Sequence, residues 1–301
     1  MAMEHRRGRV SLIKAASWAF TLLAAGAVVA MVGLFVWQSR PVWRHAGWGF
    51  LSGREWFYRQ EIFGAAPMIY GTLVVAAVAL GLAAPIGIGA ALFTSEFLPR
   101  RLRIPVKVSL ELLAGVPSVV YGLLGILLLR GWVYDLLEPW EPLSGDTLLT
   151  AGLLLAVMIL PTVMTLTEDA LRGVPAAQRL AARGLGLTAT EVVLRVSLPQ
   201  AAPGILAAVL LSLGRALGEM IAVFLVVGRQ DNQWPSPLLT LRPLTEAGQT
   251  LASKLGGAET SIAYGDPLHW SAMVGLALVL LALVTSLTLL GARLRRSDHA
   301  P

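Results

Sequence analysis

The sequence predicts an all-α integral membrane protein with six transmembrane helices and both termini in the cytoplasm. Of the 301 residues, 56% are hydrophobic and only 14% are charged, against roughly 25% charged residues in soluble domains. The apolar residues form long continuous runs rather than short alternating segments, which excludes a lipid-facing β-barrel. The basic residues lie mainly on alternate connections between these runs, as they do in multi-pass membrane proteins.

Six apolar runs are long enough to cross a bilayer as helices, which takes about 20 residues. They cover residues 15–37, 68–93, 106–129, 147–166, 201–227 and 271–290. The first run is longer than the apolar part of a signal peptide, about 7–15 residues, so we expect it to remain as a helix. We therefore divide the chain into an N-terminal arm, first helix and external loop (1–67), a core of five helices (68–293) and a cytoplasmic tail (294–301).

The orientation follows from the basic residues. Fifteen of the 24 Lys and Arg residues fall on the side that holds both termini, and eight fall on the other side. The positive-inside rule places the richer side in the cytoplasm. The net charge of +6 thus indicates a membrane rather than a nucleic-acid partner. The chain has no cysteine, and its four histidines lie far apart in the sequence, so we expect neither a disulfide nor a metal site.

Two charged residues fall near the middle of the fifth run. Arg215 and Glu219 are four residues apart, which predicts that they share one helix face. An unpaired charge at this depth costs at least ~3 kcal/mol, so both side chains must face protein or water. They are candidates for a transport pathway, and the alternative is a purely structural ion pair. Gly214 and Gly218 have the small-residue spacing that lets a second helix approach closely.

Prolines interrupt three of the other runs. Pro85, Pro117 and Pro161 fall in the second, third and fourth runs, and we predict a helix break at each. Interrupted helices near the bilayer midplane line the pathways of many transporters. The alternative is that these prolines are ordinary kinks, which membrane helices tolerate. Glu111, near the start of the third run, is either a pathway residue or a carboxylate at the membrane interface.

The connection between the fourth and fifth runs, residues 168–199, has helix signals of its own. Pro175 suits the first turn of a short helix, and Gly184 or Gly186 suits its end. Thr188 and Glu191 form a capping-box pattern that predicts a second short helix, ending before Pro199. A helical pair of this kind can dock a soluble partner in a groove. The alternative is an amphipathic loop that lies on the membrane surface.

This connection resembles the coupling loop of ABC-importer permeases, whose signature is Glu-Ala-Ala, three residues, Gly, nine residues and Ile-x-Leu-Pro. The matching residues are Ala181, Ala182, Gly186, Val196, Leu198 and Pro199. Val196 replaces the isoleucine, and Leu180 stands where the signature has glutamate. The resemblance implies that the loop contacts an ATPase subunit and couples its closure to movement of the transmembrane helices.

Three further stretches sharpen the resemblance. MIYGTL opens the second run at residue 68, ELLAGVPSVVYG starts at Glu111, and LGRALGEMIAV starts at Leu213. They are similar to the PstC-like subunits of phosphate-importer permeases, over about residues 69–290. Met220 departs from the family pattern, which has threonine there. The resemblance implies the type I ABC-importer permease fold, a bacterial inner-membrane location, and a substrate pathway that includes Glu111, Ser118, Arg215 and Glu219.

The resemblance also implies partners. These are a homologous second permease (PstA-like), two ATPase subunits, an external phosphate-binding protein, inorganic phosphate and membrane lipid, with no nucleic acid. The chain has no G-x-x-x-x-G-K-[ST] motif, so we expect it to bind no cofactor and to be no enzyme itself, with ATP and Mg on the partner ATPase. Three alternatives stay open: an ABC permease for sulfate, molybdate or a phosphonate; a secondary transporter driven by an ion gradient; and a regulatory membrane scaffold.

Overall fold

The computed structural model describes residues 2–235 and 242–297, so the last four residues of the expected tail lie outside the described part. The first half contains α1 (Ala2–Ala46), α2 (Gly49–Ser52), β1 (Trp56–Phe57), β2 (Ile62–Phe63), α3 (Ala66–Leu92), α4 (Arg100–Gly115), α5 (Ser118–Leu124) and α6 (Arg130–Leu137). The second half contains α7 (Leu148–Arg172), α8 (Ala176–Gly184), α9 (Ala189–Val192), α10 (Leu198–Leu217), α11 (Ile221–Val226), α12 (Arg242–Thr245), α13 (Leu251–Leu255), α14 (Glu259–Ala263) and α15 (Pro267–Ser297). β1 and β2 form a two-stranded antiparallel hairpin, with Trp56 opposite Phe63.

Six helical segments in the described ranges are long and apolar enough to cross a membrane, as the sequence predicts. They are Ala16–Ala46, Ala66–Phe97, Ser118–Trp140, Leu148–Arg172, Ala189–Leu217 and Pro267–Arg293. The third and fifth differ from the expected ranges. The expected third run, 106–129, is divided between α4 and α5, and the helix of the expected fifth run starts earlier and stops at Leu217. The chain is thus a multi-pass helical membrane protein.

The core is built on the parallel pair α3 and α7, in which Val78 lies against Gly152 and Gly87 against Val163. Glycines let these helices approach closely: a Cβ atom at Gly87 would lie 2.8 Å from Cγ1 of Val163, and one at Gly152 would lie 2.6 Å from Cβ of Val78. Small residues at contact points are the usual way for membrane helices to gain packing energy, since lipid provides no hydrophobic drive. The buried cluster of α3 and α7 extends onto α5, α10 and α11.

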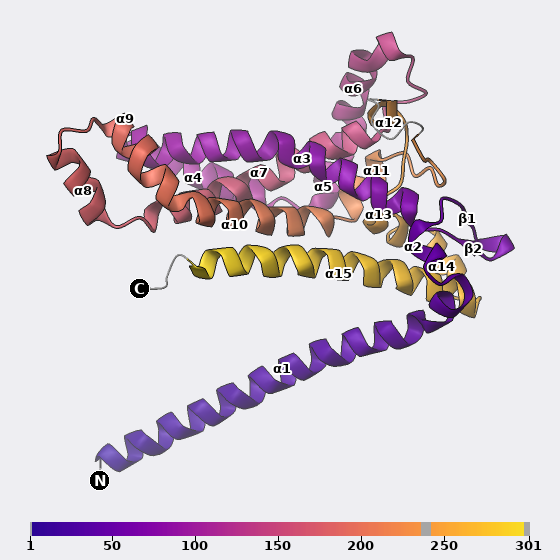
Figure 1. Cartoon of the computed structure of the whole chain (residues 1–301), viewed down its shortest axis with the longest axis horizontal. Coiled ribbons are helices and arrows are strands. Elements are labelled where there is room, and N and C mark those ends of the chain that lie inside the picture. The colour runs from indigo at the N-terminus through magenta and orange to yellow at the C-terminus, as the bar shows by residue number, and fades with distance from the viewer. Residues whose placement is uncertain (1, 236–241, 298–301) are drawn as a thin grey trace.

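Two helices lie outside this core. α15 packs along α10, where a Cβ atom at Gly214 would come within 2.9 Å of the Thr288 hydroxyl, so one glycine of the predicted small-residue pair does admit a second helix. α1 contacts α15 only toward its C-terminal end and diverges from the other helices toward Ala2 (Figure 1). Most of its apolar side chains in the membrane-length segment, such as Phe20, are exposed, whereas Val42 near its end is buried. The end of α15 and the start of α1 lie at the same end of the long axis as α8 (Figure 1).

Candidate transport pathway and coupling loop

The expected fifth run, residues 201–227, is interrupted beside the two charged residues. α10 ends at Leu217, residues 218–220 are not helical, and α11 starts at Ile221. The prediction that Arg215 and Glu219 share one helix face is therefore wrong, because Arg215 lies in the last turn of α10 while Glu219 lies in the break. The sequence has no proline here that would have indicated the break. Discontinuous helices of this type occur at ion and substrate sites in transporters.

Arg215 is an exposed cation in the last turn of α10. Its Nη1 atom donates a hydrogen bond to the Thr162 hydroxyl of α7, at 3.2 Å. In the part of the chain that the structure describes, no carboxylate lies within ion-pair distance of Arg215, and Glu219 does not pair with it. The alternative of a structural ion pair between these two residues is thus not supported by this geometry.

Glu219 faces a different environment. Its Oε1 atom accepts a hydrogen bond from the backbone N–H of Ala222, at 3.4 Å, in the first turn of α11. A carboxylate at this position suits the positive end of a helix. Glu219 also lines a small cavity together with Thr72 of α3, Leu155 of α7 and Thr250. It therefore connects the start of α11 to the packed core.

The expected third run, residues 106–129, is also interrupted. α4 ends at Gly115, the backbone of Val116 and Pro117 is extended, and α5 starts at Ser118. The Tyr121 hydroxyl crosses the interruption and donates a hydrogen bond to the carbonyl oxygen of Leu113, at 2.8 Å. Pro117 thus stands at a real helix end, since proline cannot continue the hydrogen-bond ladder of α4.

The interruption of the expected third run lies beside the interruption of the expected fifth run. A Cβ atom at Gly122 of α5 would lie 3.2 Å from Cα of Ala222, so α5 and α11 are in close contact. Ser118, the first residue of α5, is half-buried, and Glu111 is exposed on α4. No hydrogen bond or ion pair in the described ranges joins Glu111 or Ser118 to Arg215 or Glu219. The fold brings α5 and α11 together, but not these side chains.

The other two prolines do not interrupt their helices. Pro85 lies inside α3 and Pro161 lies inside α7, and both helices continue beyond them. The predicted breaks at these positions are therefore wrong. A proline removes only one backbone hydrogen bond, and neighbouring helices can stabilise the turn around it. Pro161 directly precedes Thr162, the hydrogen-bond partner of Arg215.

The candidate coupling loop forms the end of the molecule that carries α8 and α9 (Figure 1). α8 ends at Gly184, and Gly186 has φ of +88°, which favours glycine at the turn. Thr188 and Glu191 make the predicted capping box, with Thr188 N donating to Glu191 Oε2 at 2.9 Å and Glu191 N donating to Thr188 Oγ1 at 3.3 Å. The loop therefore has the two helices and the glycine turn that its sequence predicts.

The second loop helix differs from the prediction in one respect. It does not end before Pro199, because a π-helical turn over Val193–Ser197 joins α9 directly to α10. Pro199 therefore lies inside a continuous helical run, just after the π-helical turn, where it removes one backbone hydrogen bond. Of the signature residues, Ala182 is buried, Val196 and Leu198 are half-buried, and Ala181, Gly186 and Pro199 are exposed. Leu180 and Leu185 are also exposed, which leaves apolar side chains at this end of the molecule.

The opposite end of the molecule contains a buried polar cluster that the sequence did not reveal. The Lys254 side chain is only 2% exposed and forms ion pairs with Asp231, at 2.6 Å, and with Glu259. Glu259 also accepts a hydrogen bond from Trp56 Nε1 at 2.6 Å, and its Oε1 atom lies 2.9 Å from Nε2 of His269. These residues come from the hairpin, the loop after α11, α13, α14 and α15. Their spacing in the sequence carries no signal of this contact.

Burial affects the two carboxylates of this cluster differently. Burial raises the pKa of Asp231 above its usual value, although the Lys254 ammonium acts in the opposite direction. Burial alone would also raise the pKa of Glu259, but hydrogen bonds from Lys254, Trp56 and His269 outweigh it and lower the pKa. Glu259 is therefore the carboxylate that the cluster holds most firmly in its charged form.

The cluster fixes α13 against the interruption of the expected fifth run. The backbone N–H of Leu251 donates a hydrogen bond to the Thr72 hydroxyl of α3, at 2.9 Å. A Cβ atom at Gly256, just after α13, would lie 2.9 Å from the sulfur of Met220, which is in the break between α10 and α11. Lys254 thus anchors a segment that covers the break from the hairpin end.

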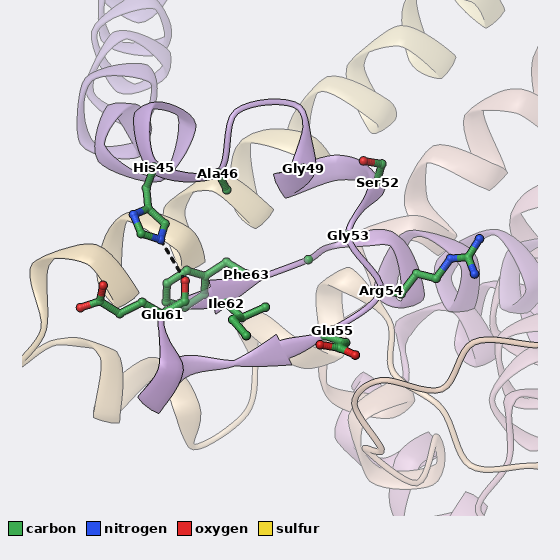
Figure 2. A pocket seen from close by; sticks show the side chains of 11 residues that line it. His45, Ala46, Gly49, Ser52, Gly53, Arg54, Glu55, Glu61, Ile62 and Phe63 are labelled. Atoms are coloured by element: carbon green, nitrogen blue, oxygen red, sulfur yellow. Dashed lines mark hydrogen bonds between the residues drawn. The ribbon is translucent and has the colours of Figure 1, made fainter.

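A pocket of about 510 Å³ also lies at the hairpin end (Figure 2). It is lined by the end of α1, α2 and the hairpin, and Nε2 of His45 lies 3.1 Å from the carbonyl oxygen of Glu61 at its edge. Its lining carries both charge signs, including Arg54 and Glu55. None of the expected pathway or coupling residues lies in it.

The family of the chain follows from comparison with known proteins. The family model described as "binding-protein-dependent transport system inner membrane component" matches residues 83–297, which include both helix interruptions and the whole coupling loop. The chain belongs to this family of permeases. Its expected pathway residues and its candidate coupling loop therefore lie within the part of the chain that matches these permeases.

Individual relatives place the permease more closely. It is 36% identical over 295 residues to "Phosphate transport system permease protein PstC" of Mesorhizobium japonicum, covering 90% of this chain and 86% of the relative. It is 38% identical over 245 residues to "PstC 1" of Mycobacterium tuberculosis, covering 76% and 72%. The permease is thus PstC-like, as its GRALGE and ELLAGVPS stretches predict.

Solved structures support the fold. A chain of a bacterial alginate ABC transporter, in complex with an alginate pentasaccharide-bound periplasmic protein, aligns with a TM-score of 0.59 at 14% identity, covering 94% of the permease and 96% of that chain. At this identity the likeness concerns the fold alone. The permease has the fold of ABC-importer transmembrane subunits.

Proposed function

We propose that this permease forms half of the translocation pathway of an ATP-driven importer for inorganic phosphate. The relatives are named as phosphate transport system permeases. The single observation that carries the proposal for this chain is Arg215, an exposed guanidinium without an ion-pair partner in the described ranges, beside a helix interruption. A fixed guanidinium matches the geometry of a phosphate oxygen pair and keeps its charge at any physiological pH.

The pathway residues take different roles in this proposal. Arg215 meets the phosphate dianion, while Glu219 holds the first turn of α11 in place and does not neutralise Arg215. Glu111 and Ser118 line the same pathway on α4 and at the start of α5. The helix interruptions at Pro117 and at residues 218–220 provide non-helical backbone in this pathway, and membrane proteins tolerate such backbone where it is buried in protein or lines a cavity.

The proposal includes the partners of an ABC importer. A homologous PstA-like permease would supply the other half of the pathway, and an external phosphate-binding protein would deliver the anion at the hairpin end. Two ATPase subunits would bind ATP and Mg, because this chain has no nucleotide-binding motif. They would contact the cytoplasmic coupling loop through Ala181, Ala182, Gly186, Val196, Leu198 and Pro199. In this arrangement both termini and α8 lie in the cytoplasm. The permease core is residues 68–293, as expected from the sequence, between the N-terminal part (1–67) and the tail (294–301).

The proposed substrate and energy source can be tested together in proteoliposomes. The purified complex with its ATPase subunits and binding protein should take up radioactive phosphate only when ATP is present on the side of the coupling loop. Vanadate should stop this uptake, whereas an uncoupler should not. Competition by sulfate, molybdate and a phosphonate tests the other oxyanions. Uptake driven by an ion gradient without ATP, or stronger competition by another oxyanion than by phosphate itself, would contradict the proposal.

The coupling loop gives a separate prediction at Gly186. Replacing it by valine should strain the turn between α8 and α9, since a left-handed backbone costs a non-glycine residue about 1–2 kcal/mol or more. No other atom lies within 4 Å of a Cβ atom at Gly186, so the strain is local and the bundle should stay folded. We expect Gly186→Val to reach the membrane but to hydrolyse ATP without transport.

The matched control is Gly184→Val. Gly184 is the last residue of α8, and a Cβ atom there also meets open space, but its φ is not in the left-handed region. This variant should transport phosphate at nearly the native rate. Normal transport per ATP by Gly186→Val would show that the glycine turn is not needed for coupling.

A further inference from the structure

One side chain of the coupling loop joins three separate parts of the fold. Nη1 of Arg179, in the first half of α8, donates a hydrogen bond to Oε1 of Glu96 at 2.7 Å, and its Nη2 donates to the carbonyl oxygen of Leu171. The Arg179 and Glu96 side chains are 23% and 13% exposed, so the ion pair is largely shielded from solvent. Glu96 follows α3, and Leu171 lies in the last turn of α7.

Both attachment points are fixed in the core. Glu96 lies in a π-helical turn over Phe93–Phe97 that continues α3. Leu171 is fully buried and packs in a cluster with Val174, Ala201 and Ile205. α3 and α7 are the central packed pair of the molecule, and α7 reaches Arg215 through Thr162. A displacement of α8 would therefore act through Arg179 on the ends of the two helices that form the core.

The other ion pairs at this end of the molecule do not join different elements. Arg172 pairs with Glu168 within α7, and Arg195 pairs with Glu191 within the continuous helical run from α9 to α10. An exposed pair four residues apart on one helix, such as Arg195–Glu191, contributes only ~0.3–0.5 kcal/mol. The Arg179–Glu96 pair spans 83 residues of sequence. Among the ion pairs in the described part of the coupling loop, it is the one that links α8 to another membrane segment.

We propose that Arg179 is a positioning residue that transmits the movement of α8 to α3 and α7. This inference rests on the proposed function, in which α8 follows the ATPase subunits. The planar guanidinium holds a carboxylate and a backbone carbonyl at once, in fixed relative directions. It therefore passes on a push or a pull between α8 and the two core helices, whereas the side chains of Leu180 and Leu185 are exposed. Without Arg179, α8 should still move with the ATPase subunits, but α3 and α7 should no longer move with α8.

The first test compares phosphate moved per ATP hydrolysed, in the complete reconstituted complex. Arg179→Gln keeps a donor for Leu171 but removes the charge, and Glu96→Gln removes the charge from the other side of the pair. Each should lower the ratio about tenfold, because charge-assisted hydrogen bonds are roughly twice as strong as neutral ones. ATP hydrolysis and assembly should persist. Arg179→Lys, which keeps one ionic bond, should recover the ratio to within about threefold of the native value.

The matched control is Arg103→Gln. Nε of Arg103 donates a hydrogen bond to the carbonyl oxygen of Leu98 at 2.9 Å, so it lies at the same end of the molecule, but it ties α4 and not α8 to the end of α3. This variant should keep the ratio within about twofold of native. If Arg179→Gln fails to assemble, Glu96→Gln decides, since Glu96 is not on α8. A native ratio for Glu96→Gln, or an equal loss for Arg103→Gln, would overturn the inference.

A second test does not depend on the transported substrate. The chain has no cysteine, so spin labels can be placed directly at Gln178→Cys on α8 and Phe97→Cys after α3, both exposed positions. In the native complex the distance distribution between the labels should stay narrow and keep its mean when ATP is added. Arg179→Gln should broaden it or shift its mean with ATP. An unchanged distribution in Arg179→Gln would refute the link, even in a complex that proves not to carry phosphate.

Discussion

Replacing Arg215 by glutamine is expected to lower phosphate uptake by roughly 30- to 150-fold without preventing assembly. The estimate takes the loss of a charge-assisted interaction as about 2–3 kcal/mol, with a factor of ten for every 1.4 kcal/mol. Arg215 is exposed and makes a single side-chain hydrogen bond, to Thr162, so its loss leaves no buried partner unsatisfied. Initial rates of radioactive phosphate uptake in proteoliposomes measure the effect.

Three further variants sharpen this prediction. Arg215→Lys keeps the charge but not the planar fork, and it should fall between the native protein and Arg215→Gln. Arg44→Gln makes the same change at an exposed residue near the end of α1, and uptake should stay native. Glu219→Gln keeps an acceptor for the N–H of Ala222 and should do less harm than Arg215→Gln.

Exchanging the two charges tests whether Arg215 and Glu219 act as an ion pair or have separate roles. The structure has no ion pair between Arg215 and Glu219, so Arg215→Glu with Glu219→Arg should restore nothing. Full uptake by this double variant would show that the two residues act as a pair after all. Native uptake by Arg215→Gln would remove Arg215 from the pathway and leave the phosphate proposal resting on the relatives.

The second large effect concerns stability. Replacing Lys254 by methionine should lower the free energy of unfolding by about 3–5 kcal/mol, the usual result of removing one partner from a buried ion pair. Methionine fills similar space, but Asp231 and Glu259 would be left as neighbouring carboxylates without their cation. Denaturation of the purified permease in mixed detergent micelles measures the change.

Two comparisons show whether the destabilisation of Lys254→Met comes from buried, uncompensated carboxylates or from lost packing. Arg130→Met removes the ion pair with Asp146, in which the side chains are 43% and 26% exposed, and should cost less than about 1 kcal/mol. Adding Glu259→Gln to Lys254→Met should recover part of the stability, because one uncompensated charge disappears. If Lys254→Met is as stable as the native permease, the cluster does not anchor α13.

The sequence by itself determined the class of the protein and the shape of its loop. Continuous apolar runs can only be satisfied in lipid as helices, so six membrane segments follow from length and composition. The glycine turn at Gly186 and the capping box of Thr188 and Glu191 also follow, because they depend on residues within one turn of each other. The resemblance to PstC-like permeases rests on local stretches and is confirmed by the relatives.

Only the tertiary structure decided how the charged residues are used. No proline near Leu217 predicts the helix break that follows it. At this position α11 packs against α5 at Gly122, and the backbone leaves the helix. Conversely, Pro85 and Pro161 stay helical inside the packed pair α3 and α7. The cluster around Lys254 and the link from Arg179 to Glu96 join segments far apart in sequence. Such contacts depend on how the helices pack against one another. They produce no periodic pattern in the sequence from which they could be predicted.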